Sequence, residues 1–149
     1  MLISTKGRYA LRVMVDLAEQ DPERFVRLQE IADRQGISEK YLEGIVVKLS
    51  RAGDLVSARG KGGGYRLSRA PEAYTVLSIL ERIEGKLAPV SCLEQEPVRC
   101  SRAPDCATLP LWEGLHARIE AYLGSVTLRD LMERAGRGKL GEKAQVSDT

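Results

Sequence analysis

Apolar residues recur at helical spacing in three segments near the start of the chain, which indicates three amphipathic helices. The first has Ser4 or Thr5 as its N-cap and the third has Ser38, because a hydroxyl oxygen accepts from the free N–H groups of a first turn. Gly36 separates the second helix from the third, so these two form a helix-turn-helix pattern. The predicted helices cover residues 5–19, 28–35 and 39–52.

Two short strands follow the third helix, over residues 55–58 and 65–67, and a glycine-rich basic turn joins them. A hairpin directly after the second helix of a helix-turn-helix is typical of a wing. Residues 57–69 hold four basic and no acidic residues, which gives this stretch a net charge of +4. Glycines let a backbone approach phosphates, and cations replace the counterions of DNA, so the hairpin favours DNA binding over a merely solvated loop. The four cations are Arg59, Lys61, Arg66 and Arg69.

The second half of the chain predicts helices on either side of an irregular segment. Thr75 caps a helix that ends at Glu84, and no periodicity is visible over residues 86–108. A long helix starts at Pro110 and stops at Gly124, and Thr127 caps a last short helix. The predicted fold is mainly α with a small β-hairpin wing. Its parts are a winged helix-turn-helix (1–70), a linker helix with a cysteine loop (71–108), a dimerisation helix with a C-terminal helix (109–134) and a disordered tail (135–149).

Composition narrows the class of protein. The chain has 149 residues, 43% of them hydrophobic and 30% charged, as expected for a globular protein of one domain or one domain with an appendage. No apolar run approaches the roughly 20 residues of a membrane span, and the first residues form no secretory signal, so we expect a cytoplasmic protein. The run Gly62-Gly63-Gly64 precedes a strand, whereas a nucleotide-binding loop precedes a helix. With no nucleophile–base pair visible either, an enzyme is disfavoured.

Three motifs resemble the Rrf2 family of bacterial transcription regulators, over about residues 1–134. The resemblance implies a winged-helix domain joined by a long helix into a homodimer, which binds a roughly palindromic DNA operator. We expect repression rather than activation, although the sequence does not distinguish the two. The resemblance also implies that the long helix packs against its partner, although the same stripe could line a ligand site. The stripe consists of Leu111, Trp112, Leu115, Ile119 and Tyr122. The three motifs are Ile3-Ser4-Thr5-Lys6-Gly7-Arg8-Tyr9-Ala10, Gly36-Ile37-Ser38…Tyr41-Leu42-Glu43 and Val56…Arg59-Gly60…Gly62-Gly63-Gly64-Tyr65-Arg66-Leu67.

By this resemblance, the start of the third helix faces the major groove and the wing faces the minor groove. Glu43 would accept from a cytosine amino group or reject other bases; alternatively it pairs with Lys40 or Lys48 on the surface. Arg59 and Gly60 correspond to a minor-groove contact, where a narrow groove attracts arginine. The groove-facing helix residues are Ser38, Lys40, Tyr41 and Glu43, and the expected phosphate contacts are Lys6, Arg8, Lys61 and Arg66.

Cys92, Cys100 and Cys106 lie in the irregular segment, with seven and then five residues between them. An odd number of thiols in a reducing compartment points to metal or redox chemistry, and thiolates suit iron–sulfur clusters and zinc. The resemblance implies an iron–sulfur cluster, [2Fe-2S] or [4Fe-4S], in this loop. The family's usual pattern has five residues in each gap, so the first gap here is longer by two.

No fourth ligand transfers from the family. IscR-like members place a histidine where this chain has Leu109, and NsrR-like members use an acidic residue where it has Arg8. His116, the only histidine, is interpreted as a structural residue of the long helix. The alternative is an Rrf2-type regulator without a cluster, which senses through thiols, zinc or a partner protein. The candidate fourth ligands are Asp105, Glu94, Glu96, His116, a solvent species and a small thiol.

Overall fold

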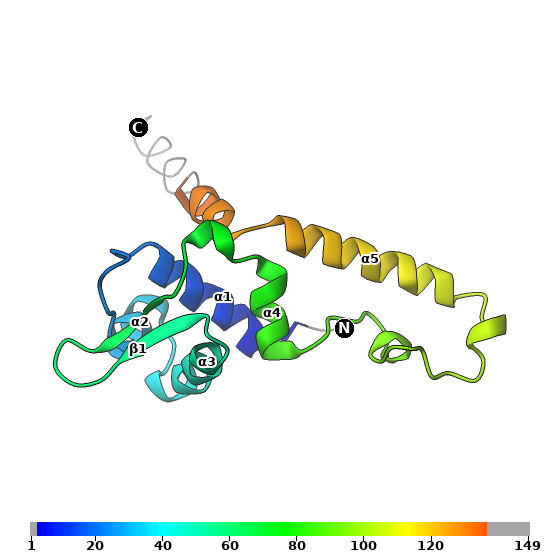
Figure 1. The fold of residues 1–149 in the computed structure, drawn as a ribbon, viewed down its shortest axis with the longest axis horizontal. Helices are drawn as coiled ribbons and strands as arrows, with labels where there is room; N and C mark the ends of the chain where they lie inside the picture. The colour runs from blue at the N-terminus through cyan, green and yellow to red at the C-terminus, as the bar shows by residue number, and fades with distance from the viewer. Residues whose placement is uncertain (1–2, 137–149) are drawn as a thin grey trace, which may run out of the picture.

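A computed structural model describes residues 3–136, and its first half contains the three predicted helices (Figure 1). The Ser4 hydroxyl accepts from the N–H of Gly7 at 3.1 Å, and the Ser38 hydroxyl accepts from the N–H of Tyr41 at 3.2 Å. Both serines are therefore N-caps, as predicted. Gly36 adopts the left-handed conformation after the second helix and lets the chain turn into the third. The helices are α1 (Thr5–Ala18), α2 (Leu28–Gln35) and α3 (Glu39–Arg51).

The apolar stripes of these helices meet in one core, which also includes residues beyond position 70. Tyr74, Ile79, Ile83 and Leu128 join the cluster formed by α1, α2 and α3. The division of the chain at residue 70 stays a prediction, but the hydrophobic core is continuous across it. The face of α3 that the sequence assigns to the core is fully buried, each side chain contributing about 1.5–3 kcal/mol. That face consists of Leu42, Ile45, Val46 and Leu49.

The hairpin consists of β1 (Leu55–Ala58) and β2 (Gly64–Leu67), which pair antiparallel from Leu55 opposite Leu67 to Ala58 opposite Gly64. The structure adds a pairing that sequence reasoning missed, because Val26 and Tyr65 exchange two backbone hydrogen bonds of 2.8 Å. Gly64 is required at this crossing: its φ is +145°, and a Cβ atom there would collide with the Val26 carbonyl. The end of the glycine run thus fastens the wing to the segment before α2.

A hydrogen-bonded network holds the base of the wing against α4 (Val76–Glu84). The buried Tyr74 hydroxyl donates to the Asp54 carbonyl at 2.6 Å and accepts from the N–H groups of Ser68 and Arg69 at 3.0 and 3.1 Å. The Asp54 carboxylate, itself buried, pairs with Arg69 at 2.7 Å and with Arg82 of α4 at 3.0 Å. One acidic residue therefore connects both ends of the hairpin with the helix behind it.

Replacing Tyr74 by phenylalanine is expected to lower the free energy of unfolding by about 1–3 kcal/mol, because it removes the partner of the buried Asp54 carbonyl and of two partly buried N–H groups. Urea denaturation measures the change. Tyr41→Phe is the matched control for unfolding in the absence of DNA, because the Tyr41 side chain is exposed and lies outside the stripe that the sequence assigns to the dimer interface, and it should shift the midpoint little. Equal midpoints for Tyr74→Phe and the wild-type protein would show that the hydroxyl network contributes nothing to stability.

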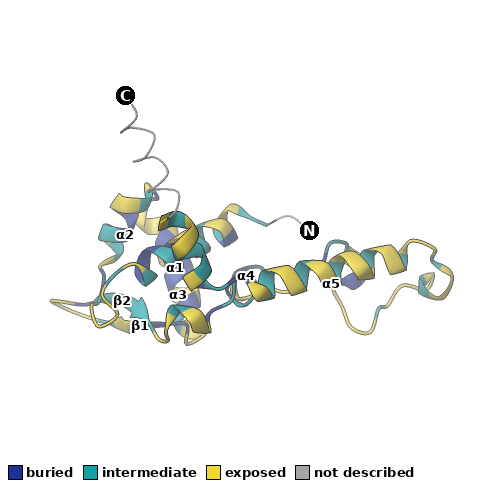
Figure 2. Cartoon of the chain, turned by 90° about the horizontal axis from the view of Figure 1, so that it is seen from above, coloured by how far each residue is buried: buried dark blue, intermediate teal, exposed yellow. Residues whose placement is uncertain are grey.

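The helix α5 (Leu109–Ser125) extends away from the winged part, at the end of the molecule opposite the turn of the hairpin (Figures 1 and 2). None of its residues is buried. The prediction that Gly124 ends this helix was wrong, because an interior glycine costs only about 1 kcal/mol and the helix continues to Ser125. It ends where the Val126 carbonyl accepts from the Val76 N–H at 2.8 Å.

Residues 128–136 form the last helical segment, and Thr127 caps it as predicted: its hydroxyl accepts from the Asp130 N–H at 3.2 Å. The segment between α4 and α5 contains only the short 3₁₀ turns η2 (Ser91–Leu93) and η3 (Ala103–Asp105); a further turn, η1 (Pro71–Ala73), precedes α4. Of the disordered tail predicted for residues 135–149, residues 135 and 136 are helical, so the predicted start was wrong, and the rest lies outside the described residues. Among residues 3–136, no helix is long and apolar enough to cross a membrane.

Candidate nucleic-acid interface and cysteine loop

The start of α3 presents its polar side chains to solvent, opposite its buried face. Ser38, Lys40, Tyr41 and Glu43 are all exposed. Within residues 3–136, Glu43 forms no ion pair with Lys40 or Lys48, and the Lys48 ammonium instead donates to the carbonyl of Ile83 at 3.1 Å. The surface ion pair that could have occupied the Glu43 carboxylate is absent from the described part of the chain, which leaves this carboxylate available to another partner.

Tyr41 is held in place by a contact that the sequence did not reveal. Its ring meets the ring of Tyr9 edge-on, with centroids 5.6 Å apart and planes inclined by 74°. The guanidinium of Arg12 lies over the ring of Tyr9, 5.2 Å from its centroid. It also donates to the side-chain oxygen of Gln35 at 3.1 Å. Two residues of α1 thus fix the orientation of an exposed tyrosine at the start of α3.

The first turn of α1 lies beside α3. A Cβ atom at Gly44 would stand 3.8 Å from the Lys6 ammonium, so this cation belongs to the same surface as α3. Arg8 is exposed, and its guanidinium donates to the Thr5 hydroxyl at 3.0 Å. The structure therefore brings Lys6 to the groove-facing residues predicted on α3.

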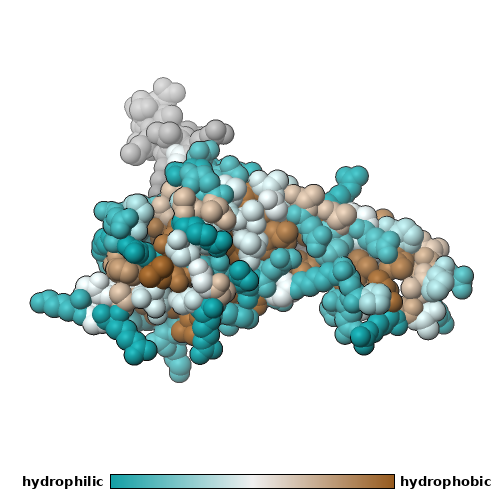
Figure 3. All heavy atoms as spheres, viewed as in Figure 1, coloured by the Kyte–Doolittle hydropathy of each residue, from teal (hydrophilic) through white to brown (hydrophobic). Residues whose placement is uncertain are grey.

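The wing carries fewer unpaired cations than the four that its sequence contains over residues 57–69. Arg59 and Lys61 are exposed, with no ion pair among the described residues, and Gly60 between them has a φ of +82°. Arg66 instead stacks on Phe25, 4.6 Å from the ring centroid, and pairs with Glu23 at 3.3 Å. Arg69 pairs with Asp54 as described above, so two of the four counted charges are engaged within the protein. Figure 3 shows hydrophilic side chains gathered at this edge of the molecule.

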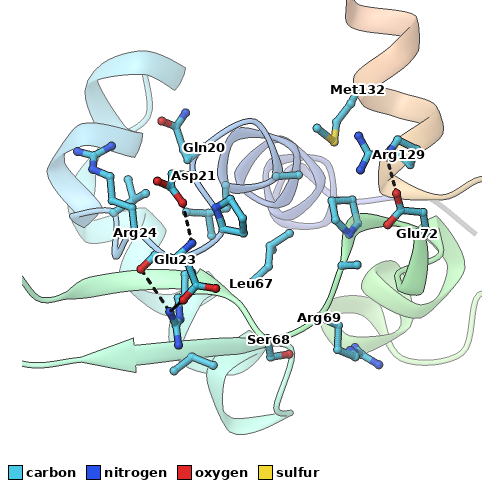
Figure 4. A pocket seen from close by; sticks show the side chains of 18 residues that line it. Gln20, Asp21, Glu23, Arg24, Leu67, Ser68, Arg69, Glu72, Arg129 and Met132 are labelled. Atoms are coloured by element: carbon cyan, nitrogen blue, oxygen red, sulfur yellow. Dashed lines mark hydrogen bonds and ion pairs between the residues drawn. The ribbon is translucent and has the colours of Figure 1, made fainter.

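A cavity of about 530 Å³ lies behind the wing, between the end of α1, β2 and the helical residues 128–136 (Figure 4). Arg66 and Glu23 form an ion pair on one side of it, and Arg129 pairs with Glu72 at 2.7 Å on the other. These pairs neutralise arginine charges of the cavity wall. The cavity therefore adds no free cation to the surface formed by α3, the first turn of α1 and the wing.

The cysteine loop, residues 86–108, does not gather its three thiols in this structure. Cys92 and Cys100 are exposed and Cys106 is half-buried. Among the described residues, no three histidine, cysteine or acidic side chains lie close enough together to hold a metal ion. The donor chemistry fits an iron–sulfur cluster, because three thiols share one loop and two of them are exposed to an incoming metal.

Two candidate fourth ligands have partners within the protein. The ring nitrogens of His116 face the carbonyl of Leu87 at 3.0 Å and the carboxylate of Glu120 at 3.0 Å, so the side chain joins α5 to the segment after α4. Glu96 pairs with Lys86 at 2.8 Å. The arrangement of His116 is that of a structural residue, which agrees with the interpretation from the sequence.

Cys106 occupies a different environment from the other two cysteines because it directly precedes α5. The Thr108 hydroxyl, 3.4 Å from its sulfur, together with the N–H groups of Thr108 and Leu109, lowers the pKa of the Cys106 thiol. Hydrogen bonds from a helix N-terminus favour the thiolate over the thiol.

In the metal-free protein, Cys106 is therefore expected to react with iodoacetamide at lower pH than an ordinary thiol, whose pKa is about 8.5. Mass spectrometry of the alkylated peptides over a pH series gives the profile of each cysteine. Thr108→Val should move the Cys106 profile to higher pH, whereas the matched variant Ser101→Ala should not. Identical profiles for Cys106 in the wild-type and Thr108→Val proteins would contradict this assignment.

The stripe of α5 that the sequence assigns to a dimer interface is largely open to solvent. Leu111, Leu115 and Tyr122 are 62%, 41% and 59% exposed, and Trp112 and Ile119 are half-buried. The helix has 17 residues and no buried position, so packing against the rest of the same protomer stabilises it little. Its apolar side chains therefore form a surface that a partner would cover.

A sequence model of the Rrf2 family, described as an iron-dependent transcriptional regulator, matches residues 3–134. The chain belongs to the Rrf2 family. The HTH-type transcriptional regulator IscR of Aliivibrio salmonicida is 38% identical over 132 residues, which cover 89% of this chain and 77% of IscR. Family and relatives are DNA-binding transcription regulators and not enzymes.

Two solved structures confirm the winged-helix fold of this Rrf2 protein. The global cysteine regulator CymR of B. subtilis superposes with a TM-score of 0.74 at 38% identity and covers 90% of this chain and 98% of its own. IscR of T. potens has a TM-score of 0.70 at 37% identity and covers 91% of this chain and 88% of its own. The resemblance deduced from the sequence motifs and the predicted fold class are confirmed.

Proposed function

We propose that the protein is a homodimeric transcription repressor, and that the cysteine loop controls its binding to a DNA operator. The observation that carries the proposal is the arrangement of α3 and the wing. The start of α3 exposes Ser38, Lys40, Tyr41 and Glu43, and the wing that follows directly presents Arg59 and Lys61 without ion pairs among the described residues. A protein that binds operators in this way acts on the chromosome, in the bacterial cytoplasm.

In this proposal the surface divides into groups that read bases and groups that bind phosphates. The side chains at the start of α3 enter the major groove, and Arg59 with Gly60 reaches the minor groove. Lys6, Arg8 and Lys61 bind phosphates and fix the register. Arg66 contributes less than the sequence suggests, because its guanidinium is stacked on Phe25 and paired with Glu23.

The homodimer is supported by the open apolar stripe of α5. Packing this helix against the same helix of a second copy would cover the side chains of Leu111, Leu115 and Tyr122. Two recognition helices related by a two-fold axis suit a palindromic operator whose half-sites lie about one helical turn apart. Sedimentation of the wild-type protein tests this part, and Leu111→Arg should shift it towards the monomer.

Cys92, Cys100 and Cys106 would hold an iron–sulfur cluster, with a fourth ligand from another group. When bound, a cluster supplies one-electron redox chemistry at its iron, which three thiols alone lack. This chain contributes the three thiols, of which Cys92 and Cys100 are exposed. A second candidate is regulation through the free thiols, zinc or a partner protein. It is favoured by the observation that the three thiols stand apart in the described structure.

Purification without oxygen, followed by visible absorbance and iron and sulfide analysis, separates these candidates. A cluster gives visible absorbance and stoichiometric iron, which should disappear in the triple variant Cys92→Ser, Cys100→Ser, Cys106→Ser but remain in Ser101→Ala. Operator binding is then measured before and after cluster loss. A colourless, iron-free protein whose DNA affinity responds to thiol oxidants supports the second candidate. Failure to enrich any sequence in a genomic DNA selection would contradict the regulator itself.

A further inference from the structure

The first turn of α1 is tied to the end of α4 by Glu84, a residue 80 positions away along the chain. The Glu84 carboxylate accepts from the backbone N–H of Ser4 at 3.1 Å and from the Ser4 hydroxyl. That same hydroxyl oxygen accepts from the N–H of Gly7 and caps α1. Because the hydroxyl has one hydrogen, donating it to Glu84 leaves the lone pairs of its oxygen directed at the helix. Glu84 thus orients the N-cap of α1.

Gly7 leaves the space that this contact needs. A Cβ atom at position 7 would collide with Glu84 Oε1, and Gly7 is buried against α4. The residue is inside a helix, where glycine is unfavourable by about 1 kcal/mol relative to alanine. The close approach of the carboxylate gives a reason for glycine at this position.

The end of α4 holds α3 as well as α1. The carbonyl of Ile83 accepts from the Lys48 ammonium on α3 at 3.1 Å. Gly85 follows at once with a φ of +78°, and the cysteine loop begins at residue 86. Two neighbouring residues at the end of α4, just before the loop, therefore bond to both helices that carry the candidate DNA contacts.

We infer that Glu84 is a positioning residue for DNA binding: it fixes the first turn of α1, with Lys6 and Arg8, and links that turn to the start of the cysteine loop. The inference rests on the proposed function, in which Lys6 and Arg8 bind phosphates. A displacement of the loop that moves the end of α4 would withdraw Glu84 from Ser4, loosen the cap and release the first turn. The state of the loop would then change the number of phosphates bound.

Hydrogen exchange of the full-length protein without DNA tests the positioning by itself. Glu84→Ala should raise exchange in the peptide that covers residues 3–12, while the peptides of α3 stay protected. Glu84→Gln keeps an acceptor oxygen and should restore much of the protection. Glu81→Ala is the matched control, because Glu81 is an exposed glutamate of the same helix. Unchanged exchange in Glu84→Ala, or a rise throughout the protein, would overturn the positioning role.

The salt dependence of binding to a mixed-sequence DNA duplex tests the consequence for phosphate contacts. In Glu84→Ala, the phosphate contact of Lys6 or of Arg8 should be lost in both protomers. The slope of log K against log salt should then fall by about 2, since each phosphate contact contributes about 0.9. Glu81→Ala should keep the wild-type slope. An unchanged slope in Glu84→Ala would overturn the link to DNA. If the wild-type protein binds no DNA, the proposed function fails, and hydrogen exchange alone decides the role of Glu84.

The link to the loop is measured by a double-mutant cycle on DNA affinity. The triple cysteine-to-serine variant is compared with the wild-type loop in the Glu84 and Glu84→Ala backgrounds. The effect of the loop on affinity should shrink several-fold without the Glu84 carboxylate. Equal effects in the two backgrounds would overturn the link, and no effect in either would contradict control by the loop as well.

Discussion

Replacing Arg59 by alanine is expected to lower the affinity of the protein for its operator by about a hundredfold or more, since a charge-assisted hydrogen bond contributes about 1.5–3 kcal/mol and the dimer loses two. Arg59 is exposed at the turn of the wing, and no carboxylate of the described residues pairs with it. Its guanidinium is thus free to enter the minor groove. Fluorescence anisotropy with a labelled operator measures the affinity, and the salt slope should fall by about 2. The midpoint of urea unfolding should stay the same.

Arg66→Ala is the matched control because it removes the same charge from the same hairpin. The Arg66 guanidinium stacks on Phe25 and pairs with Glu23, so its loss should change the stability of the wing more than the salt slope. Equal losses of affinity and equal changes of slope in the two variants would mean that both arginines contact DNA. The ion pair seen in the free protein would then open on binding.

The difference between these two arginines shows what the sequence could and could not predict. The charge of the hairpin is visible in the sequence, but the partner of each charge lies elsewhere in the chain. Glu23 precedes α2, and Asp54 meets Arg82 across 28 positions. Such pairs form because the core brings α1, α4 and the hairpin together. Periodicity within one segment carries no information about them.

The elements themselves were predictable because their signals are local. The hydroxyls of Ser4, Ser38, Thr75 and Thr127 each accept from an N–H three residues ahead, as N-caps do. The end of α5 was predicted wrongly at Gly124, because a glycine near a helix end is a weak signal. The hydrogen bond between Val126 and Val76 decides where α5 stops. The same distinction applies to the cysteines: their spacing gives the donor set, whereas convergence depends on a loop with little packing of its own.

Changing Glu43 to alanine is expected to alter which operators the protein accepts rather than how strongly salt weakens binding. A carboxylate near DNA is repelled by phosphates and gains most where it accepts from a cytosine amino group. Glu43 is exposed on α3 and has no ion pair within residues 3–136, so no internal contact of its carboxylate has to be broken before it can bind a base. Loss of one such contact relaxes discrimination at its base pair by about 1–3 kcal/mol, a change of roughly five- to 150-fold.

Selection from a randomised operator library, with wild-type and Glu43→Ala proteins in parallel, measures this preference position by position. The variant should tolerate other bases at one position of each half-site, while its salt slope stays at the wild-type value. Arg59→Ala should do the reverse, with a weaker, less salt-dependent interaction and an unchanged preference in the major groove. Lys40→Ala is the control on the same helix turn. The Lys40 ammonium would contact a different base edge or a phosphate, so its loss should leave the preference at the Glu43 position unchanged. If Glu43→Ala and Arg59→Ala changed preference and salt slope alike, the separation of base reading by α3 from charge supplied by the wing would be contradicted.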